Sequence, residues 1–153
     1  MLLNLAKQMC KESAMLRESL IEATHFFAKD VLASEVSLFE SCPMGSFYAA
    51  QIAISGDANY HVAVYINKES LVKMAYLFLF EEDPDEATLT DLIKEITNLI
   101  VGKAKVIAAG SGLNFDISTP DFISDNTNVC ENDLEINFMF EDQIFSIAAK
   151  AEA

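Results

Sequence analysis

Three stretches of the chain carry apolar residues at the three- and four-residue spacing of an amphipathic helix. They run from Leu2 to about Leu32, from Lys68 to about Phe80, and from Leu89 to about Ala109. Asn67 is placed to cap the second helix, and Thr88 or Thr90 is placed to cap the third. The segment Gly110-Ser111-Gly112 is typical of a helix end. The pattern therefore predicts three helices, of which the first and the third are long.

Six shorter segments have the alternation, or the β-branched and aromatic residues, that are typical of strands. They are Ser34 to Ser41, Phe47 to Ile54, Tyr60 to Ile66, Leu113 to Thr119, Leu134 to Phe140, and Ile144 to Ala149. Turn-forming residues join the second segment to the third at Ser55 to Asn59, and the fifth to the sixth at Glu141 to Gln143. Each of these two pairs is therefore predicted to form an antiparallel hairpin. The segment Asp121 to Asp133 is predicted to be a polar loop.

The predicted order is a helix, three strands, two helices and three strands. Runs of antiparallel strands with helices segregated from them in sequence are typical of α+β folds. We therefore expect a two-layer structure in which long helices pack on a mainly antiparallel sheet. No linker, low-complexity segment or internal repeat divides residues 1–153, so we interpret them as a single domain.

The charge of the chain narrows the range of partners. It has 24 acidic residues against 10 lysines and arginines, which gives a formal net charge of −14. Such a chain is repelled by nucleic-acid phosphates and by anionic lipids, so neither a nucleic acid nor a membrane is an expected partner. The apolar run Met74 to Phe80 is far shorter than the ~20 residues of a membrane span. No signal-peptide pattern is present near Met1, and we expect a cytoplasmic protein.

The residues that most often bind metals are scattered. The cysteines are odd in number and lack a CxxC pair; they are Cys10, Cys42 and Cys130. We expect three free thiols rather than a disulfide framework or a zinc site. His25 and His61 are isolated, and the acidic loop Asp121 to Asp133 lacks the glycine and spacing of an EF-hand. No metal site is predicted.

The third predicted helix carries the most informative polar pattern. Asp91, Glu95, Asn98 and Gly102 are four, three and four residues apart, and therefore form one stripe about 60° wide. The apolar residues of the opposite side are Leu89, Leu92, Ile96, Leu99 and Ile100. Glycine costs a helix about 1 kcal/mol relative to alanine, and asparagine is also unfavourable there. The stripe is therefore either a surface kept for contact or an ordinary solvated face of an acidic protein.

The segments KEITNLIVGKAK (94–105) and GLNFDISTP (112–120) resemble the CheC/CheX/FliY family of bacterial chemotaxis phosphatases. The family pattern of an acidic residue or serine, then Glu, then Asn, and later Pro matches Asp91, Glu95, Asn98 and Pro120. A single Glu-x-x-Asn signature resembles CheX more than CheC, which carries two. Lys94 departs from the small residue that is common before the glutamate. The resemblance begins near Leu20, and residues 1–16 are interpreted as a helical N-terminal extension.

The resemblance implies a CheX-like fold and a phosphatase acting on a phosphorylated CheY-type response regulator. By this analogy, Asn98 orients the attacking water and Glu95 pairs with a lysine beside the aspartyl phosphate, so these two are the expected catalytic residues. Asp91 and Gly102 are expected to bind the partner, and Pro120 to end its strand. No cofactor of the chain's own is implied, since the Mg²⁺ belongs to the regulator. A homodimer is also implied.

Two alternatives to this function stay open. Flagellar-switch proteins share the fold and bind signalling partners without turnover, so the chain could be a non-catalytic adaptor for a response regulator. A remote third possibility is an acidic mimic of nucleic acid, for which the net charge is the only argument.

Overall fold

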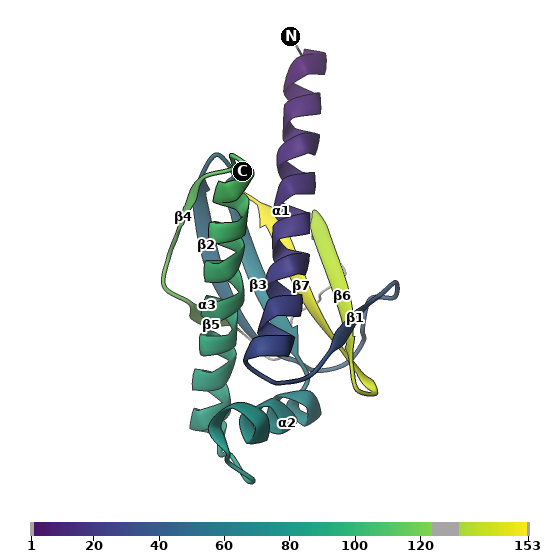
Figure 1. Cartoon of the computed structure of the whole chain (residues 1–153), viewed down its shortest axis with the longest axis vertical. Coiled ribbons are helices and arrows are strands. Elements are labelled where there is room, and N and C mark those ends of the chain that lie inside the picture. Colours follow the sequence, from purple (N-terminus) through teal and green to yellow (C-terminus); the bar gives the residue numbers. More distant parts are fainter. Residues whose placement is uncertain (1, 124–131, 153) are drawn as a thin grey trace.

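The computed structural model describes residues 2–123 and 132–152 (Figure 1). Within these ranges the helices are α1 (Leu2–Asp30), α2 (Lys68–Leu79) and α3 (Glu86–Gly110). The strands are β1 (Val36–Phe39), β2 (Tyr48–Gly56), β3 (Tyr60–Ile66), β4 (Phe115–Ile117), β5 (Asp121–Ile123), β6 (Leu134–Phe140) and β7 (Gln143–Ala151). Every helix and strand expected from the sequence is present, together with the additional strand β5.

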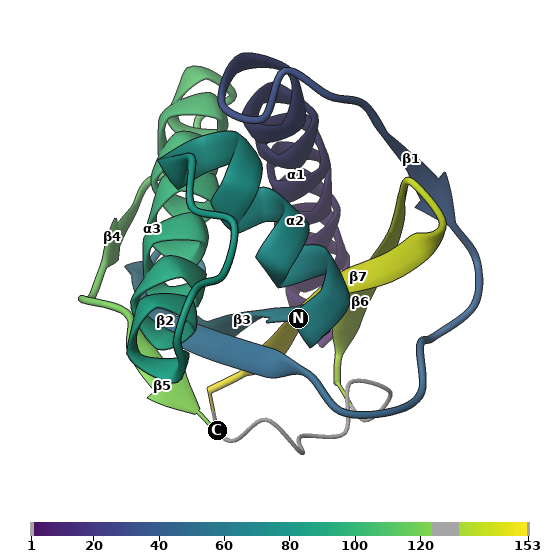
Figure 2. The same ribbon diagram turned by 90° about the horizontal axis from the view of Figure 1, so that it is seen from below.

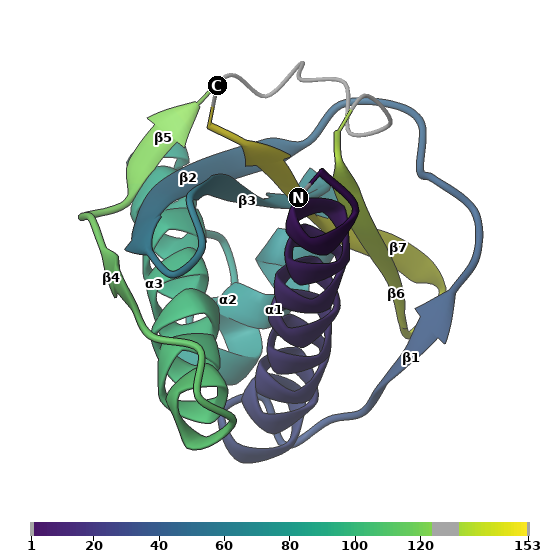
Figure 3. The same cartoon turned by 90° about the horizontal axis from the view of Figure 1, so that it is seen from above.

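The strands form one antiparallel sheet in the order β1-β6-β7-β3-β2-β4. β5 also pairs with β2, further along the same edge as β4. The two predicted hairpins, β2–β3 and β6–β7, are both formed. Figures 2 and 3 show the three described helices gathered on one face of this sheet. The prediction of a two-layer α+β fold is confirmed.

Apolar side chains fill the space between the helices and the sheet. The α1 contribution includes Leu16, Leu20, Ala23 and Phe27, and the α3 contribution includes Ile93, Ile96, Ile100 and Ala104, all of them buried. From the sheet, Phe138 and Phe145 stack with their ring centroids 5.2 Å apart. Each fully buried large aliphatic or aromatic side chain contributes about 1.5–3 kcal/mol. This packing sets the rotation of α3 about its axis, and so decides which of its residues face outward.

Helix α3 begins a turn earlier than the sequence pattern predicted. Its N-cap is Asp85, whose Oδ1 accepts a 2.8 Å hydrogen bond from the backbone N–H of Thr88. The prediction that Thr88 or Thr90 caps this helix is therefore wrong. From the sequence, the acidic segment before Thr88 is typical of a link between two helices. An aspartate is nevertheless a good N-cap, because its carboxylate accepts this hydrogen bond well. The negative charge of Glu86 in the first turn also interacts favourably with the helix dipole. The bond from Thr88 also lowers the pKa of Asp85.

The segment from Asp121 was predicted to be a loop, but its first three residues form β5, which pairs with Ala49–Gln51 of β2. A strand of three mostly exposed residues has too little alternation to be recognised from the sequence. The rest of that predicted loop up to residue 131 lies outside the described residues.

The strand order places the C-terminal hairpin inside the sheet. β6 and β7 both have neighbours on either side, because β1 pairs with β6 and β7 pairs with β3. The edges of the described sheet are β1 at one side and β4 with β5 at the other. Sequence order alone does not determine this, because the early strand β1 returns to pair with a late one.

Cys42 is disulfide-bonded, so the expectation of three free thiols is wrong for this residue. Disulfide formation depends on whether two Cα atoms come within about 4.4–6.8 Å of each other. The wide spacing of the cysteines along the chain carries no information about that distance.

No helix in residues 2–123 and 132–152 is both long and apolar enough to cross a membrane.

Candidate functional site

Helix α3 presents the predicted polar stripe to the outside. Its buried residues are Leu89, Leu92, Ile93, Ile96, Thr97, Ile100, Val101, Ala104 and Ala108. The side chains of Asp91, Glu95 and Asn98 lie on the opposite face and are exposed, and Gly102 is half-buried. The structure therefore brings all four predicted residues together on one outward surface of one helix.

Thr97 anchors the helix between the two central residues of the stripe. Its side chain is fully buried, and its hydroxyl donates a 2.7 Å hydrogen bond to the carbonyl oxygen of Ile93. Because Thr97 points into the core, Glu95 and Asn98 on either side of it are held pointing away from the core. Their backbone positions are thus set by packed residues of the same helix turn.

The side chains of Glu95 and Asn98 make no hydrogen bond or ion pair with any residue the structure describes. Asp91 differs, because its Oδ1 lies 3.7 Å from Nζ of Lys94 in an i,i+3 ion pair. Lys94 therefore neutralises Asp91 rather than Glu95. The carboxylate of Glu95 and the amide of Asn98, one helical turn apart, are both available to an external partner.

Gly102 has no packing reason to be glycine. A Cβ atom built at this position meets nothing within 4 Å, and the backbone is helical. An alanine there would fit and would favour the helix. The absence of a side chain at this half-buried point leaves the helix backbone open to close approach from outside.

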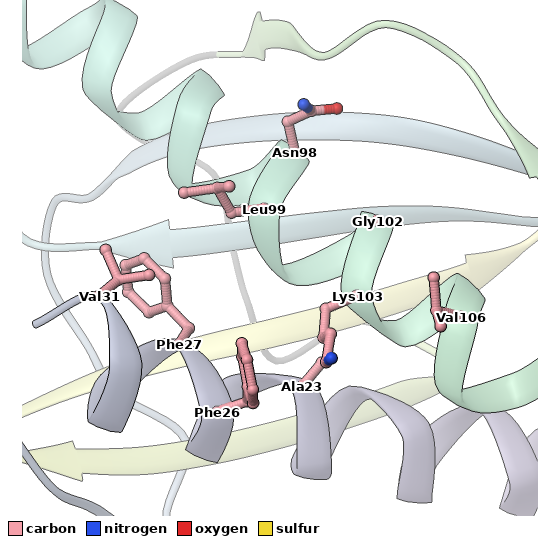
Figure 4. A pocket seen from close by; sticks show the side chains of 9 residues that line it. All are labelled: Ala23, Phe26, Phe27, Val31, Asn98, Leu99, Gly102, Lys103 and Val106. Atoms are coloured by element: carbon pink, nitrogen blue, oxygen red, sulfur yellow. The ribbon is translucent and has the colours of Figure 1, made fainter.

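A groove runs beside the stripe between α1 and α3, and sequence reasoning missed it (Figure 4). It has a volume of about 340 Å³, and Asn98 and Gly102 of the stripe help to line it. Across the groove, Phe26 of α1 is 45% exposed, and Nζ of Lys103 lies 4.0 Å from its ring centroid. Val106 of α3 is 65% exposed at the same groove. The helical periodicity of α1 contains one indication of this groove. Phe27 follows the buried face of the helix, so the neighbouring Phe26 must lie outside that face as an exposed aromatic residue.

The remaining sequence candidates lie elsewhere. His25 is exposed, and its ring forms a T-shaped pair with that of Phe138, with the centroids 6.1 Å apart. Nδ1 of His61 lies 3.3 Å from Nε2 of Gln51. Pro120 is half-buried in the link between β4 and β5. Among the residues that the structure describes, no group of three or more His, Cys, Asp or Glu side chains is placed to hold a metal ion.

The sequence profile of the family described as chemotaxis phosphatase CheX matches residues 48–140, which is more than half of the chain. The chain belongs to the CheX family. The matched range contains Asp91, Glu95, Asn98 and Gly102, and it confirms the resemblance inferred from their spacing. α1 precedes the matched range.

Solved structures of CheX and related proteins share the fold of this family member. The structure of CheX from Vibrio vulnificus has a TM-score of 0.77 at 20% identity, over 90% of this chain and 96% of that one. CheX from Borrelia burgdorferi, solved in a CheX–CheY–BeF₃–Mg²⁺ complex, has a TM-score of 0.70 at 19% identity, over 87% of this chain and 96% of that one. FliY from Thermotoga maritima has a TM-score of 0.61 at 15% identity, over 92% and 90% of the two chains. No curated protein matches the sequence.

Proposed function

We propose that this CheX-family protein hydrolyses the aspartyl phosphate of a phosphorylated CheY-type response regulator. The observation that carries the proposal is the pair Glu95 and Asn98. Their side chains are exposed one turn apart on a packed helix and are engaged by none of the described residues. A chain that only needed a soluble helix surface would gain stability from better helix formers at positions 98 and 102.

In the proposed reaction, a water attacks the phosphorus of the aspartyl phosphate in line with the leaving carboxylate. The P–O bond to the aspartate breaks, and the products are inorganic phosphate and the free aspartate. The Asn98 side chain, inserted beside the phosphate, accepts a hydrogen bond from this water through Oδ1 and positions it. A neutral amide suits this role, because a carboxylate would repel the phosphoryl oxygens. Positioning and electrostatics are most of what phosphoryl transfer requires.

The other residues of the stripe bind the regulator in this proposal. Glu95 forms an ion pair with the lysine that response regulators carry beside the phosphate. Asp91, already paired with Lys94, adds to the docking surface, and Gly102 lets the partner's backbone approach the helix. The Mg²⁺ that the reaction uses is bound by the regulator, and this chain supplies no metal of its own.

Two further facts support the choice of partner. CheX from Borrelia burgdorferi has been solved in complex with CheY, BeF₃ and Mg²⁺. The net charge of −14 disfavours nucleic acids and anionic membranes as partners, and a lysine at the rim of the regulator's site is complementary to it. Since such regulators act in the cytoplasm, the proposal also places this protein there.

The proposal includes a homodimer. β1 is an edge strand, and its Leu38 and Phe39 are 51% and 37% exposed. An edge strand with exposed apolar residues favours pairing with a second copy across a two-fold axis. The glutamate and asparagine are on α3, so each protomer carries its own complete pair.

The experiment that tests the proposal follows phosphate loss from a phosphorylated CheY-type regulator with Mg²⁺, with and without catalytic amounts of this protein. We expect faster loss with the wild type and none above background with Asn98→Ala. The matched control is Asn114→Ala, which removes another exposed asparagine side chain outside the stripe and should be as active as the wild type.

If the wild type accelerates phosphate loss with none of the regulators of its source organism, the phosphatase proposal is wrong. Binding of a regulator without any change in the lifetime of its phosphate would instead identify the protein as an adaptor.

A further inference from the structure

Helix α2 turns an apolar surface outward. Its buried residues are Ser70, Leu71, Met74 and Ala75. On the opposite side, Tyr76 is 54% exposed, Leu79 is 40% exposed and Phe80 is 84% exposed. Figures 1 and 2 show α2 lying across one end of the helical layer, near the start of α3. We call Tyr76, Leu79 and Phe80 the α2 surface.

Phe80 is held in an unusual conformation as well as an exposed one. It is the C-cap of α2, with φ 59° and ψ 29°. Its N–H donates a hydrogen bond to the carbonyl oxygen of Tyr76, and the N–H of the next residue, Glu81, donates to that of Ala75. This left-handed position at a helix end is usually glycine, because other side chains are strained there. A large aromatic residue here is unfavourable for the folded state both in conformation and in exposure. Cover by a partner protein would remove the cost of exposing this ring.

A hollow opens beside the α2 surface. It has a volume of about 560 Å³ and is lined by Val72, Lys73, Tyr76, Leu77, Glu82 and Glu141. The hollow is thus lined both by apolar side chains of α2 and by two carboxylates, one from the loop after α2 and one from the β6–β7 turn.

The surroundings are strongly acidic. Residues 68–86 and 141–142 contain eight acidic residues and two lysines. Lys68 lies 3.6 Å from Glu86, and Lys73 lies 2.6 Å from Glu141 and 3.7 Å from Asp142, so both lysines are already paired. Glu81, Glu82 and Asp83 next to Phe80 are exposed and form no ion pair with the described residues.

We propose that the α2 surface is a docking site for a basic amphipathic helical segment of a partner protein. The apolar side of the segment covers Tyr76, Leu79 and Phe80, and its lysines and arginines pair with the carboxylates that follow Phe80. A second copy of this chain is a poor occupant, because two surfaces with the same negative charge repel each other. The site is on α2 and does not depend on the proposed phosphatase activity.

The test uses a fluorescently labelled 18-residue peptide of leucine and lysine at amphipathic helical spacing, and its leucine–glutamate counterpart. Fluorescence anisotropy measures the binding of each to the full chain. We expect the basic peptide to bind with an affinity that falls as salt rises, and the acidic peptide not to bind.

Two variants locate the binding. Phe80→Gly removes the exposed ring and suits the left-handed backbone, so it should fold at least as stably as the wild type and weaken binding about tenfold or more. Met44→Ser removes another side chain that is 93% exposed, and should bind the peptide as the wild type does. Equal affinity of Phe80→Gly and the wild type would show that the peptide binds the acidic surface at large, and would overturn the proposal.

The phosphate-release assay separates this proposal from the proposed function. Phe80→Gly should dephosphorylate an isolated regulator at the wild-type rate, since Phe80 is not part of the stripe on α3. Loss of peptide binding with unchanged phosphate release supports two separate sites. Loss of both in a folded Phe80→Gly variant would contradict the separation.

Discussion

At the scale of single residues, α3 carries two residues that disfavour a helix, Asn98 and Gly102, close to a glutamate, Glu95, that is available for contact. Asn98 and Gly102 are both poorer helix formers than alanine, and neither is required by the packing of the described residues. Glu95 lies between Asp91 and Asn98 on the stripe, and its carboxylate forms no ion pair or hydrogen bond with the described residues. These residues are therefore better explained by what approaches the helix than by what the helix packs against.

The charge of residue 98 decides the proposed chemistry. Asn98→Asp changes the shape of the side chain very little, but it places a carboxylate next to the phosphoryl oxygens. We expect both Asn98→Asp and Asn98→Ala to lower the rate of regulator dephosphorylation about 100-fold or more, because the water is no longer positioned by a neutral amide. Stopped-flow measurement of phosphate loss gives the rate. Since the side chain is exposed, the free energy of unfolding of Asn98→Asp should lie within about 0.5 kcal/mol of the wild-type value. That of Asn98→Ala should be higher by up to about 0.7 kcal/mol, because alanine favours the helix. An active Asn98→Asp variant would contradict the proposed role.

A substitution at Gly102 should affect the stability of the fold and the binding of the regulator in opposite directions. Gly102→Ala should raise the free energy of unfolding by up to about 1 kcal/mol, since the added methyl group fits and alanine favours the helix. The same methyl group should weaken binding of the phosphorylated regulator, raising KM with little change in kcat. Gly110→Ala is the matched control, because a Cβ at Gly110 is equally unobstructed but lies at the far end of α3. Equal KM values for the two variants would argue that Gly102 does not contact the partner.

At the scale of elements, the site depends on where α3 starts and how it is rotated. Asp85 caps the helix less than two turns before Asp91, and the buried residues of α3 hold the stripe outward. Because the cap is an ionised carboxylate, this end of the helix is sensitive to acid. The hydrogen bond from the Thr88 N–H lowers the pKa of Asp85, so the folded state favours the charged form.

Asp85→Ala should lower the melting temperature by about 2–4 °C at neutral pH. A carboxyl group whose pKa is lowered by folding stabilises the protein above its unfolded pKa, about 3.9 for aspartate. That contribution is lost as the pH falls through the lower folded pKa. The difference in melting temperature between the wild type and Asp85→Ala should therefore shrink below about pH 4. Thermal unfolding followed by circular dichroism from pH 7 to pH 3 measures it, and a difference that does not depend on pH would contradict the capping role.

Most elements could be predicted because their signals are local. Tyr60–Ile66 and Leu134–Phe140 were predicted with the bounds that the structure shows, since each belongs to a hairpin with a short turn. β5 could not be predicted, because its three residues become a strand only by pairing with distant β2. The stripe on α3 follows from helical spacing within one segment. The groove beside it does not, because it arises where Phe26 of α1 meets α3 in the folded chain.

At the scale of the whole molecule, charge and apolar surface are distributed unevenly. A net charge of −14 is spread over a chain whose exposed large apolar residues include Leu38 on β1, Tyr76 and Phe80 around α2, and Phe122 on β5. Because both copies of the chain carry this net charge, contacts between them must overcome electrostatic repulsion.

The proposed homodimer should for this reason become tighter as salt is added. Screening of the repulsion between two chains of charge −14 favours association, and apolar contacts at the edge strand are not weakened by salt. Sedimentation equilibrium at low and moderate ionic strength should show a larger dimer fraction at the higher one. Leu38→Lys adds a charge to edge strand β1 and should give a monomer, because a lysine on an edge strand opposes pairing. Phe122→Lys is the matched control on the opposite edge, where Phe122 is 40% exposed, and it should remain a dimer. If Phe122→Lys alone abolishes the dimer, the interface is at β5 and the assignment to β1 is wrong. A wild type that is monomeric at every concentration and ionic strength would contradict the homodimer itself, and would leave the Glu95 and Asn98 pair to act within a single chain.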